Sequence, residues 1–205
     1  MAGRDKRAAS APEIILASVS PRRRELLRLF ECDFRVIPSS FDESTVAQWP
    51  PDKHVVESAA GKASEVAAGI STGIVIGADT IVVVDDRILG KPADAEDARR
   101  MLKLLSGRSH YVYTGLCVIR RSEGQTAAVL RDYVRTEVRF GCLTDEVIDA
   151  YVATGEPLDK AGAYGIQERG SVLVEGIVGD YFNVVGLPVY RLSHMLMELG
   201  VPIPG

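Results

Sequence analysis

The sequence of 205 residues predicts an α/β (α+β) fold built around a mixed β-sheet. Apolar runs rich in β-branched residues, such as 74–84, alternate with segments of helical periodicity, such as 54–68. Two longer apolar runs, 111–119 and 127–140, are separated by a polar turn at 122–125, which indicates an antiparallel pair. Helices that alternate with both lone strands and hairpins are typical of a mixed sheet flanked by helices.

Length and composition limit the classes of protein that this chain can belong to. The length suits one domain, residues 13–205, after a polar and mildly basic stretch, 1–12, that we expect to be a disordered tail. The net charge of −4 argues against general nucleic-acid binding. No apolar run is long enough to span a bilayer, and the tail lacks the apolar segment of a secretory signal. We therefore expect a cytoplasmic protein with no membrane partner.

The three cysteines, Cys32, Cys117 and Cys142, are widely spaced and include no CxxC pair. This spacing disfavours a disulfide framework or a zinc site and suits a reducing compartment.

The first strand leads directly into a helix. An apolar run stops at Ser18, Ser20 stands at an N-cap position and Pro21 at the first helical position. Arginines 22–24 follow, although positive charge in a first turn opposes the helix dipole. We interpret Arg22 and Arg23, with the unpaired N–H groups of the turn, as an anion-binding site. The alternative is a set of solvated surface arginines.

The other expected elements follow the same patterns of periodicity, caps and turns. They are a short strand at 34–40, a Pro-rich loop at 41–52 that could cover a site, a hairpin turn at 85–86 into a strand at 87–89, a helix capped by Asp94 and ended at Gly107, a helix from Thr144 through Val152, a Gly-rich segment at 155–170, a strand at 171–177, a strand or turn at 181–185, and a closing helix at 188–199.

Asp79 is the most informative single residue. It stands in the middle of the apolar run 74–84, where a buried carboxylate is costly unless a cation, a metal or strong donors lie nearby. Pairing with an arginine in a purely structural role is the alternative. Gly77 suggests a bulge or the close approach of a ligand. Thr80 either faces the other side of the strand or, at a bulge, joins the same site.

Further charged residues suit a phosphate-rich substrate. Glu43 is a second carboxylate, and two carboxylates with phosphate oxygens suit Mg²⁺ or Mn²⁺. Lys91, between Gly90 and Pro92, is placed to direct a point charge at phosphate. Lys62 is another candidate, although an i,i+3 pair with Glu65 explains it equally well.

The three histidines have no ligand spacing, and we interpret them as caps or satisfied surface groups: His54, His110 and His194.

The Gly-rich segment is expected to build a pocket wall, in which Gln167 offers both a donor and an acceptor for a base edge. A chain of tight turns is the alternative. The sequence has no Walker motif, dinucleotide fingerprint, nucleophile elbow or serine triad signature. Arginines at a helix start, two lysines and two acids therefore favour metal-assisted hydrolysis of a phosphoanhydride.

A set of short motifs, in order and compactly spaced from residue 14 to the last helix, resembles the Maf family of nucleoside triphosphate pyrophosphatases. The motifs are Ser18-Val-Ser-Pro-Arg-Arg23, Gly77-Ala-Asp-Thr80, Lys91-Pro92, Ser106-Gly107 with His110, Thr114-Gly115, Gly155-Glu-Pro157, Asp159-Lys-Ala-Gly162, Tyr164-Gly-Ile-Gln167 and Asn183-Val-Val-Gly-Leu-Pro188.

The resemblance implies an elongated mixed sheet flanked by helices, in an inosine-triphosphatase-like fold with a cleft between two lobes. It implies metal-dependent hydrolysis of a nucleoside triphosphate to the monophosphate and pyrophosphate, in a homodimer. The stretch 159–167 is similar to the dTTP/UTP branch, which favours those substrates and a role in clearing non-standard nucleotides. The 7-methyl-GTP branch carries a different stretch there.

The resemblance also implies roles for individual residues. Asp79 would accept a proton from water and share a metal with Glu43, while Lys62 and Lys91 would neutralise phosphates. The implied substrate-binding residues are Ser18, Ser20, Arg22, Arg23, Thr80 and Gln167, with Arg22, Thr80 and Gln167 tied to substrate choice.

Three alternatives to a dTTP/UTP pyrophosphatase stay open at this point. One is a pyrophosphatase for 7-methyl-GTP. Another is a non-catalytic nucleotide-binding regulator of cell division, against which the retained Asp79, Lys62 and Lys91 argue. A nucleotidyltransferase is the third, although the Gly-rich signature of such enzymes is missing from the arginine loop.

Overall fold

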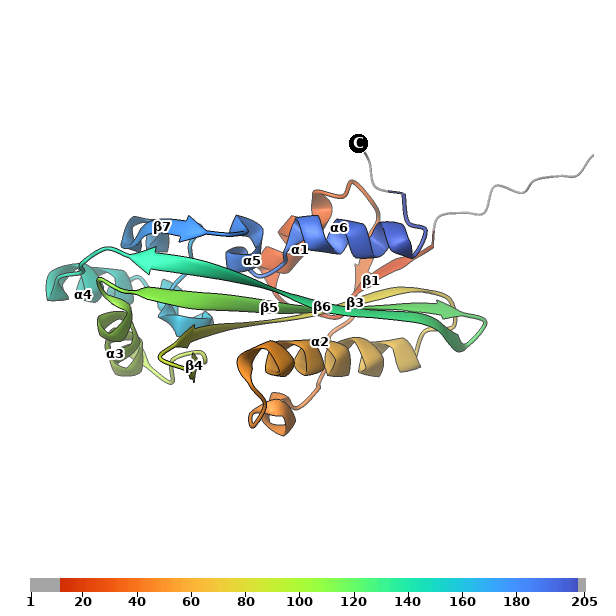
Figure 1. Ribbon diagram of the computed structural model, residues 1–205, viewed down its shortest axis with the longest axis horizontal. Helices are drawn as coiled ribbons and strands as arrows, with labels where there is room; N and C mark the ends of the chain where they lie inside the picture. Colours follow the sequence, from red (N-terminus) through yellow and green to blue (C-terminus); the bar gives the residue numbers. More distant parts are fainter. Residues whose placement is uncertain (1–11, 203–205) are drawn as a thin grey trace, which may run out of the picture.

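The computed structural model describes residues 12–202 and shows a seven-stranded mixed sheet (Figure 1). The tail predicted at residues 1–12 lies, except for Pro12, outside the described residues. The strand order is β2-β1-β3-β5-β6-β7, and β4 pairs with β3. The strands are β1 (Ile14–Leu16), β2 (Phe34–Val36), β3 (Gly73–Val84), β4 (Arg87–Leu89), β5 (Ser109–Ser122), β6 (Gln125–Phe140) and β7 (Val174–Val178).

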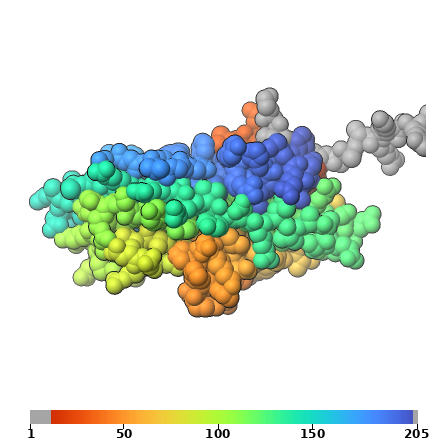
Figure 2. Space-filling model, viewed as in Figure 1, coloured from red at the N-terminus to blue at the C-terminus, as the bar shows by residue number. Residues whose placement is uncertain are grey.

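Helices flank this sheet, as the sequence predicted. Those longer than a single turn are α1 (Pro21–Arg28), α2 (Pro51–Ala68), α3 (Ala95–Leu105), α4 (Asp145–Ala153), α5 (Tyr181–Val185) and α6 (Val189–Glu198). Short 3₁₀ turns complete the described chain: η1 (Glu43–Val46), η2 (Glu156–Asp159), η3 (Ala161–Ala163) and η4 (Arg169–Leu173). Helix α2 runs along one side of the long strands, with α1, α5 and α6 on the other side (Figure 1), and the molecule is elongated (Figure 2).

The pairing directions confirm a mixed sheet. Strand β1 is parallel to both β2 and β3, whereas β3, β5, β6 and β7 are successively antiparallel. The predicted hairpin joins β5 to β6 through Glu123 and Gly124, whose φ angles of 51° and 77° are those of a tight hairpin turn.

The apolar side chains form a core on each face of the sheet. Ile15, Val75 and Cys117 pack against the alanines of α2, while Leu16, Ile76 and Phe140 belong to the larger cluster on the opposite face. This two-sided burial explains why β3 reads as a continuous apolar run rather than an alternating one.

Two glycines bring α2 close to the sheet, and this corrects the expectation for Gly77. The register between β3 and β5 continues through Gly77 without a bulge. A Cβ at Gly77 would lie 2.2 Å from the carbonyl oxygen of Ala59, and a Cβ at Gly115 would lie 2.2 Å from that of Val55. The element that approaches closely is therefore the chain's own helix rather than a ligand.

Two expectations about the C-terminal part were wrong. The expected strand at 171–177 begins only at Val174, because η4 takes up residues 169–173. Residues 181–185 form α5 instead of a strand or turn, because the Asp180 carboxylate accepts hydrogen bonds from the N–H groups of Phe182 and Asn183 and caps a helix.

Three observations concern disulfides, metal-ligand clusters and membrane-spanning helices in the described part of the chain. All three cysteines are free thiols. Within residues 12–202 there is no group of three or more His, Cys, Asp or Glu side chains placed to hold a metal ion. No described helix is long and apolar enough to cross a membrane.

Candidate active site

The site lies at a gap in the edge of the sheet. On the edge of β3 that faces away from β5, β1 pairs with residues 74–76 and β4 pairs with residues 82–84. No described strand pairs with residues 77–81 on that edge. Successive side chains point to opposite faces of a strand. Because no described strand covers this edge of β3, the space beside it can be reached from both faces of the sheet. Asp79 and Thr80 therefore reach one space from opposite sides of β3.

A cavity of about 620 Å³ opens at this gap. Its lining comes from the β1–α1 turn, α2, β3, the segment after β4, residues 156–168 and α5, so elements from most of the chain converge on it. All ten residues predicted from the sequence line it: Ser18, Ser20, Arg22, Arg23, Glu43, Lys62, Asp79, Thr80, Lys91 and Gln167. The structure thus brings the predicted residues together, and their chemical roles stay a prediction.

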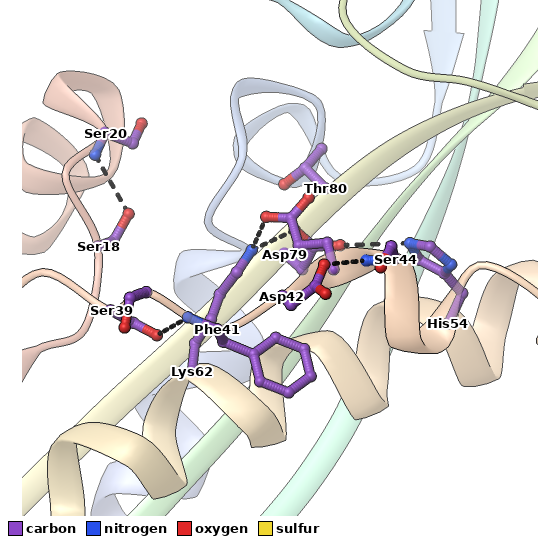
Figure 3. Close-up of polar contacts among 12 residues, drawn as sticks. Ser18, Ser20, Ser39, Phe41, Asp42, Ser44, His54, Lys62, Asp79 and Thr80 are labelled. Atoms are coloured by element: carbon purple, nitrogen blue, oxygen red, sulfur yellow. Dashed lines mark hydrogen bonds and ion pairs between the residues drawn. The ribbon is translucent and has the colours of Figure 1, made fainter.

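Asp79 and Lys62 form a largely buried ion pair in the site (Figure 3). Lys62 Nζ lies 2.6 Å from Asp79 Oδ1 and 2.6 Å from Glu43 Oε1, so one ammonium group joins two carboxylates. The side chains of Lys62 and Asp79 are only 12% and 7% exposed. Glu65, the alternative partner of Lys62, instead accepts hydrogen bonds from Ser39 and Ser40.

The second oxygen of the Asp79 carboxylate, Oδ2, is buried and has no hydrogen-bond partner among the described residues. A buried carboxylate oxygen without a donor is costly, so this atom is suited to a ligand that the cavity admits. Water, a proton or a cation would each satisfy it.

His54 was wrongly interpreted as a cap or surface group. Its ring is buried, Nδ1 lies 3.0 Å from the carbonyl oxygen of Val46, and Nε2 lies 3.9 Å from Asp79 Oδ2 (Figure 3). Because a carbonyl oxygen only accepts, Nδ1 carries a proton. A sequence signal existed: His54, Ser58 and Lys62 recur every four residues and so share one stripe of α2.

Arg23 joins three separate elements around the cavity. Its Nε donates to the carbonyl oxygen of Gly186 at 2.8 Å, Nη2 donates to Thr80 Oγ1 at 2.9 Å, and Nη1 donates to Ser18 Oγ at 3.4 Å. Burial lowers the pKa of Arg23 from its ordinary value, and the charge of Asp79 opposes that shift. Two N–H groups of the guanidinium are left for an anion.

Arg22 takes a different partner. Its Nη1 lies 3.3 Å from Oδ2 of Asp159, whose other oxygen accepts from Lys160 Nζ at 2.7 Å. Burial raises the pKa of the Asp159 carboxyl, but the hydrogen bond and charge of Lys160 and the charge of Arg22 lower it overall. Arg22 thus connects the start of α1 to the Gly-rich segment that carries Gln167.

The Ser20 side chain caps α1 as expected, since its Oγ accepts from the N–H of Arg23 at 3.4 Å. Ser18 Oγ accepts from the N–H of Ser20 at 3.2 Å, which closes the turn between β1 and α1. The local pattern of strand, serine and proline therefore places both serines at the cavity.

Thr80 faces the side of β3 opposite Asp79, with no bulge to turn it. Thr114 Oγ1 donates to the carbonyl oxygen of Asn183 at 3.0 Å, so the Thr80–Thr114 contact of 2.9 Å uses the proton of Thr80. Thr80 therefore presents only acceptor capacity to the cavity. Thr114 and Asn183 are positioning residues that the site prediction had missed.

Lys91 and Gln167 complete the lining. Lys91 is exposed in the segment after β4, and Gln167 is half-buried in the wall formed by residues 156–168. Tyr164 in the same wall contacts His110 Nε2 through its hydroxyl at 2.8 Å. His110 is fully enclosed, so its interpretation as a surface group was also wrong; burial lowers its pKa to about 4. His194 is exposed, as expected.

Known proteins match this chain over nearly its whole length. A dTTP/UTP pyrophosphatase of Moorella thermoacetica is 51% identical over 94% of this chain and 98% of its own length. A dTTP/UTP pyrophosphatase of Bacillus cereus is 49% identical over 93% of this chain and 97% of its own. Among solved structures, a HAM1 protein from Coxiella burnetii matches with a TM-score of 0.49 and 18% identity, over 91% of this chain and 99% of that one.

The family model described as Maf-like protein matches residues 13–199, which include every residue that we place around the cavity. With this match and two relatives near 50% identity, the chain belongs to the Maf family.

Proposed function

We propose that this protein hydrolyses nucleoside triphosphates, dTTP and UTP first among them, to the monophosphate and pyrophosphate. The observation that carries the proposal is Asp79: a buried carboxylate at the cavity wall with one oxygen paired to Lys62 and the other without a hydrogen-bond donor among the described residues. The names of the relatives, which match over nearly their whole length, supply the substrates.

The phosphates would be held by the cationic side of the cavity. Arg22, Arg23 and Lys91 line it together with the Ser18–Ser20 turn, where N–H groups and guanidinium forks suit phosphate oxygens. Binding of a phosphate by Arg22 would compete with its present partner, Asp159. Lys62 stands between the two carboxylates and would neutralise charge where the anhydride breaks.

Asp79 would act as the proton acceptor. Lys62 and β3 fix its position, and Oδ2 is free to accept a proton from a water molecule as that water attacks phosphorus. The oxygen of the broken anhydride bond leaves on pyrophosphate, whose charge the arginines and lysines stabilise. The water proton ends on the Asp79 carboxylate and is then released to solvent.

A divalent metal ion fits the same residues. Asp79 and the 57%-exposed Glu43 supply hard carboxylate oxygens, which suit Mg²⁺ or Mn²⁺ when the substrate phosphates complete the coordination. When bound, such an ion supplies additional neutralisation of the triphosphate charge. Glu43 and Asp79 would hold it.

Pyrophosphate release from a panel of nucleoside triphosphates, with and without Mg²⁺ or Mn²⁺, tests the proposal. We expect metal-dependent release, fastest with dTTP and UTP. Release only from 7-methyl-GTP would keep the reaction and overturn the substrate assignment. Binding of a nucleotide without release of pyrophosphate would favour a non-catalytic regulator, and consumption of a second substrate would favour a nucleotidyltransferase.

The cellular role and the assembly belong to the proposal too. Hydrolysis of this kind would clear non-standard nucleotides, and the homodimer suggested by the family resemblance is checked by sedimentation of the purified protein.

A further inference from the structure

The segment that carries Gln167 lacks the regular structure that normally fixes a backbone. Between η3 and η4, residues 164–168 form neither helix nor strand. Their backbone N–H groups therefore need other acceptors. Two side chains outside these residues accept hydrogen bonds from backbone N–H groups in and just after the segment: Tyr151 on α4 accepts from Gly165, and Glu156 at the start of η2 accepts from Arg169 and Gly170.

Glu156 holds the chain after Gln167. Its Oε1 accepts from the N–H of Gly170 at 3.1 Å, and its Oε2 accepts from the N–H of Arg169 at 3.2 Å. Hydrogen bonds to an ionised carboxylate are about twice as strong as neutral ones. A single carboxylate thus fixes two consecutive peptide groups.

Tyr151 holds the chain before Gln167. Its hydroxyl oxygen accepts from the N–H of Gly165 at 3.1 Å and donates its proton to Glu156 Oε1 at 2.9 Å. The Tyr151 side chain is almost fully buried in the main core, which leaves its hydroxyl little freedom. Burial and the Glu156 charge raise the pKa of Tyr151, so the phenol remains a donor.

The two ends of the segment are also packed tightly together. A Cβ at Gly170 would lie 2.3 Å from the carbonyl oxygen of Gly165 and 2.7 Å from the hydroxyl of Tyr151. No larger residue fits at Gly170 unless the backbone moves. Gln167 is consequently presented to the cavity from a short loop that is fixed on both sides.

We propose that Tyr151 and Glu156 are positioning residues for recognition of the nucleobase, because they hold the loop that presents Gln167 to the cavity. A carboxamide reads a base edge only if its donor and acceptor are held in register with the base. The inference rests on the proposed function and adds residues that act on base recognition through the loop that they hold.

The test is Tyr151→Phe, which removes one oxygen atom and keeps the ring that packs in the core. We expect the KM for dTTP to rise about tenfold, the effect of one lost hydrogen bond, with kcat within about twofold of the wild type. The preference for dTTP over CTP should fall. The inhibition constant of inorganic tripolyphosphate, which has no base, should not change.

Two further variants make the result decisive. Tyr190→Phe removes the same atom from a 72%-exposed tyrosine on α6 and should leave all of these quantities unchanged. Glu156→Gln replaces one acceptor by a donor and should shift KM and preference in the same direction as Tyr151→Phe. Equal losses for dTTP, CTP and tripolyphosphate would mean a merely structural role and would overturn the proposal, as would an unchanged preference.

Calorimetric binding of dTMP separates this inference from the proposed function, because it needs no turnover. Weaker dTMP binding by Tyr151→Phe supports the positioning role even if the wild type releases no pyrophosphate. Unchanged dTMP binding overturns that role even if the wild type is an active pyrophosphatase.

Discussion

Lys62 and Asp79 are joined by a nearly buried ion pair, with 2.6 Å between Lys62 Nζ and Asp79 Oδ1. The pair connects the middle of α2 to the stretch of β3 that, among the described strands, is paired only with β5, so it contributes both to the packing of the helix and to the cavity. Removal of either charge alone leaves the other in a poorly solvated place. Comparing the two single variants with the double variant should therefore separate the effect of the ion pair on catalysis from its effect on stability.

Lys62→Met should lower the free energy of unfolding by about 2–3 kcal/mol, at the low end for a broken buried pair because Asp79 lines the cavity rather than the closed core. Adding Asp79→Asn to Lys62→Met should restore most of that loss, because the charge that remains, Glu43, is 57% exposed and solvated. Urea denaturation of the two single variants and the double variant measures this coupling. A Lys62→Met protein as stable as the wild type would show that the pair does not stabilise the fold.

Gly115→Ala should push α2 away from the sheet, since the new Cβ would lie 2.2 Å from the carbonyl oxygen of Val55. We expect a loss of about 2–3 kcal/mol in the free energy of unfolding and reduced turnover, because α2 carries Lys62 and His54. Gly176→Ala in β7 is the matched control, as nothing lies within 4 Å of its Cβ. Equal stability of the two variants would contradict the proposed close contact between α2 and β5.

His110 should make stability depend on pH. Burial lowers its folded-state pKa to about 4 from the ordinary value of 6.5, so between these values the unfolded chain binds more protons. Stability should then rise with pH in this window, by up to about 1.4 kcal/mol per pH unit from His110 alone. The difference between wild type and His110→Gln in urea denaturation from pH 4 to 7 isolates this contribution. A pH-independent difference would disprove the shift, and His194→Gln, at an exposed position, should show no such trend.

The sequence predicted those structural features that depend on residues close together in the chain. The cap by Ser20, the hairpin at Glu123 and Gly124, and the burial of Asp79 all follow from short-range patterns, and each is confirmed. Helix α5 was missed because its aromatic and β-branched residues favour a strand, while the Asp180 cap and the packing favour a helix.

The arrangement of the site could not be predicted in the same way, because it is made by contacts between residues that are far apart in the sequence. That ten separated residues line one cavity follows from the gap between β1 and β4, which is a property of strand pairing. His54 was missed because its partners, Val46 and Asp79, lie on other elements. Tyr151 was missed for the same reason, since it reaches the loop from α4.

Pyrophosphate release from dTTP by Asp79→Asn, measured beside the wild type, tests the central claim most directly. Asparagine keeps the shape and an oxygen for Lys62 but cannot act as the proton acceptor. We predict a fall in kcat of at least about 100-fold in a protein that stays folded and binds dTTP, because Glu43 still pairs with Lys62. Turnover within a few fold of the wild type would contradict the assignment of Asp79 as the group that activates water.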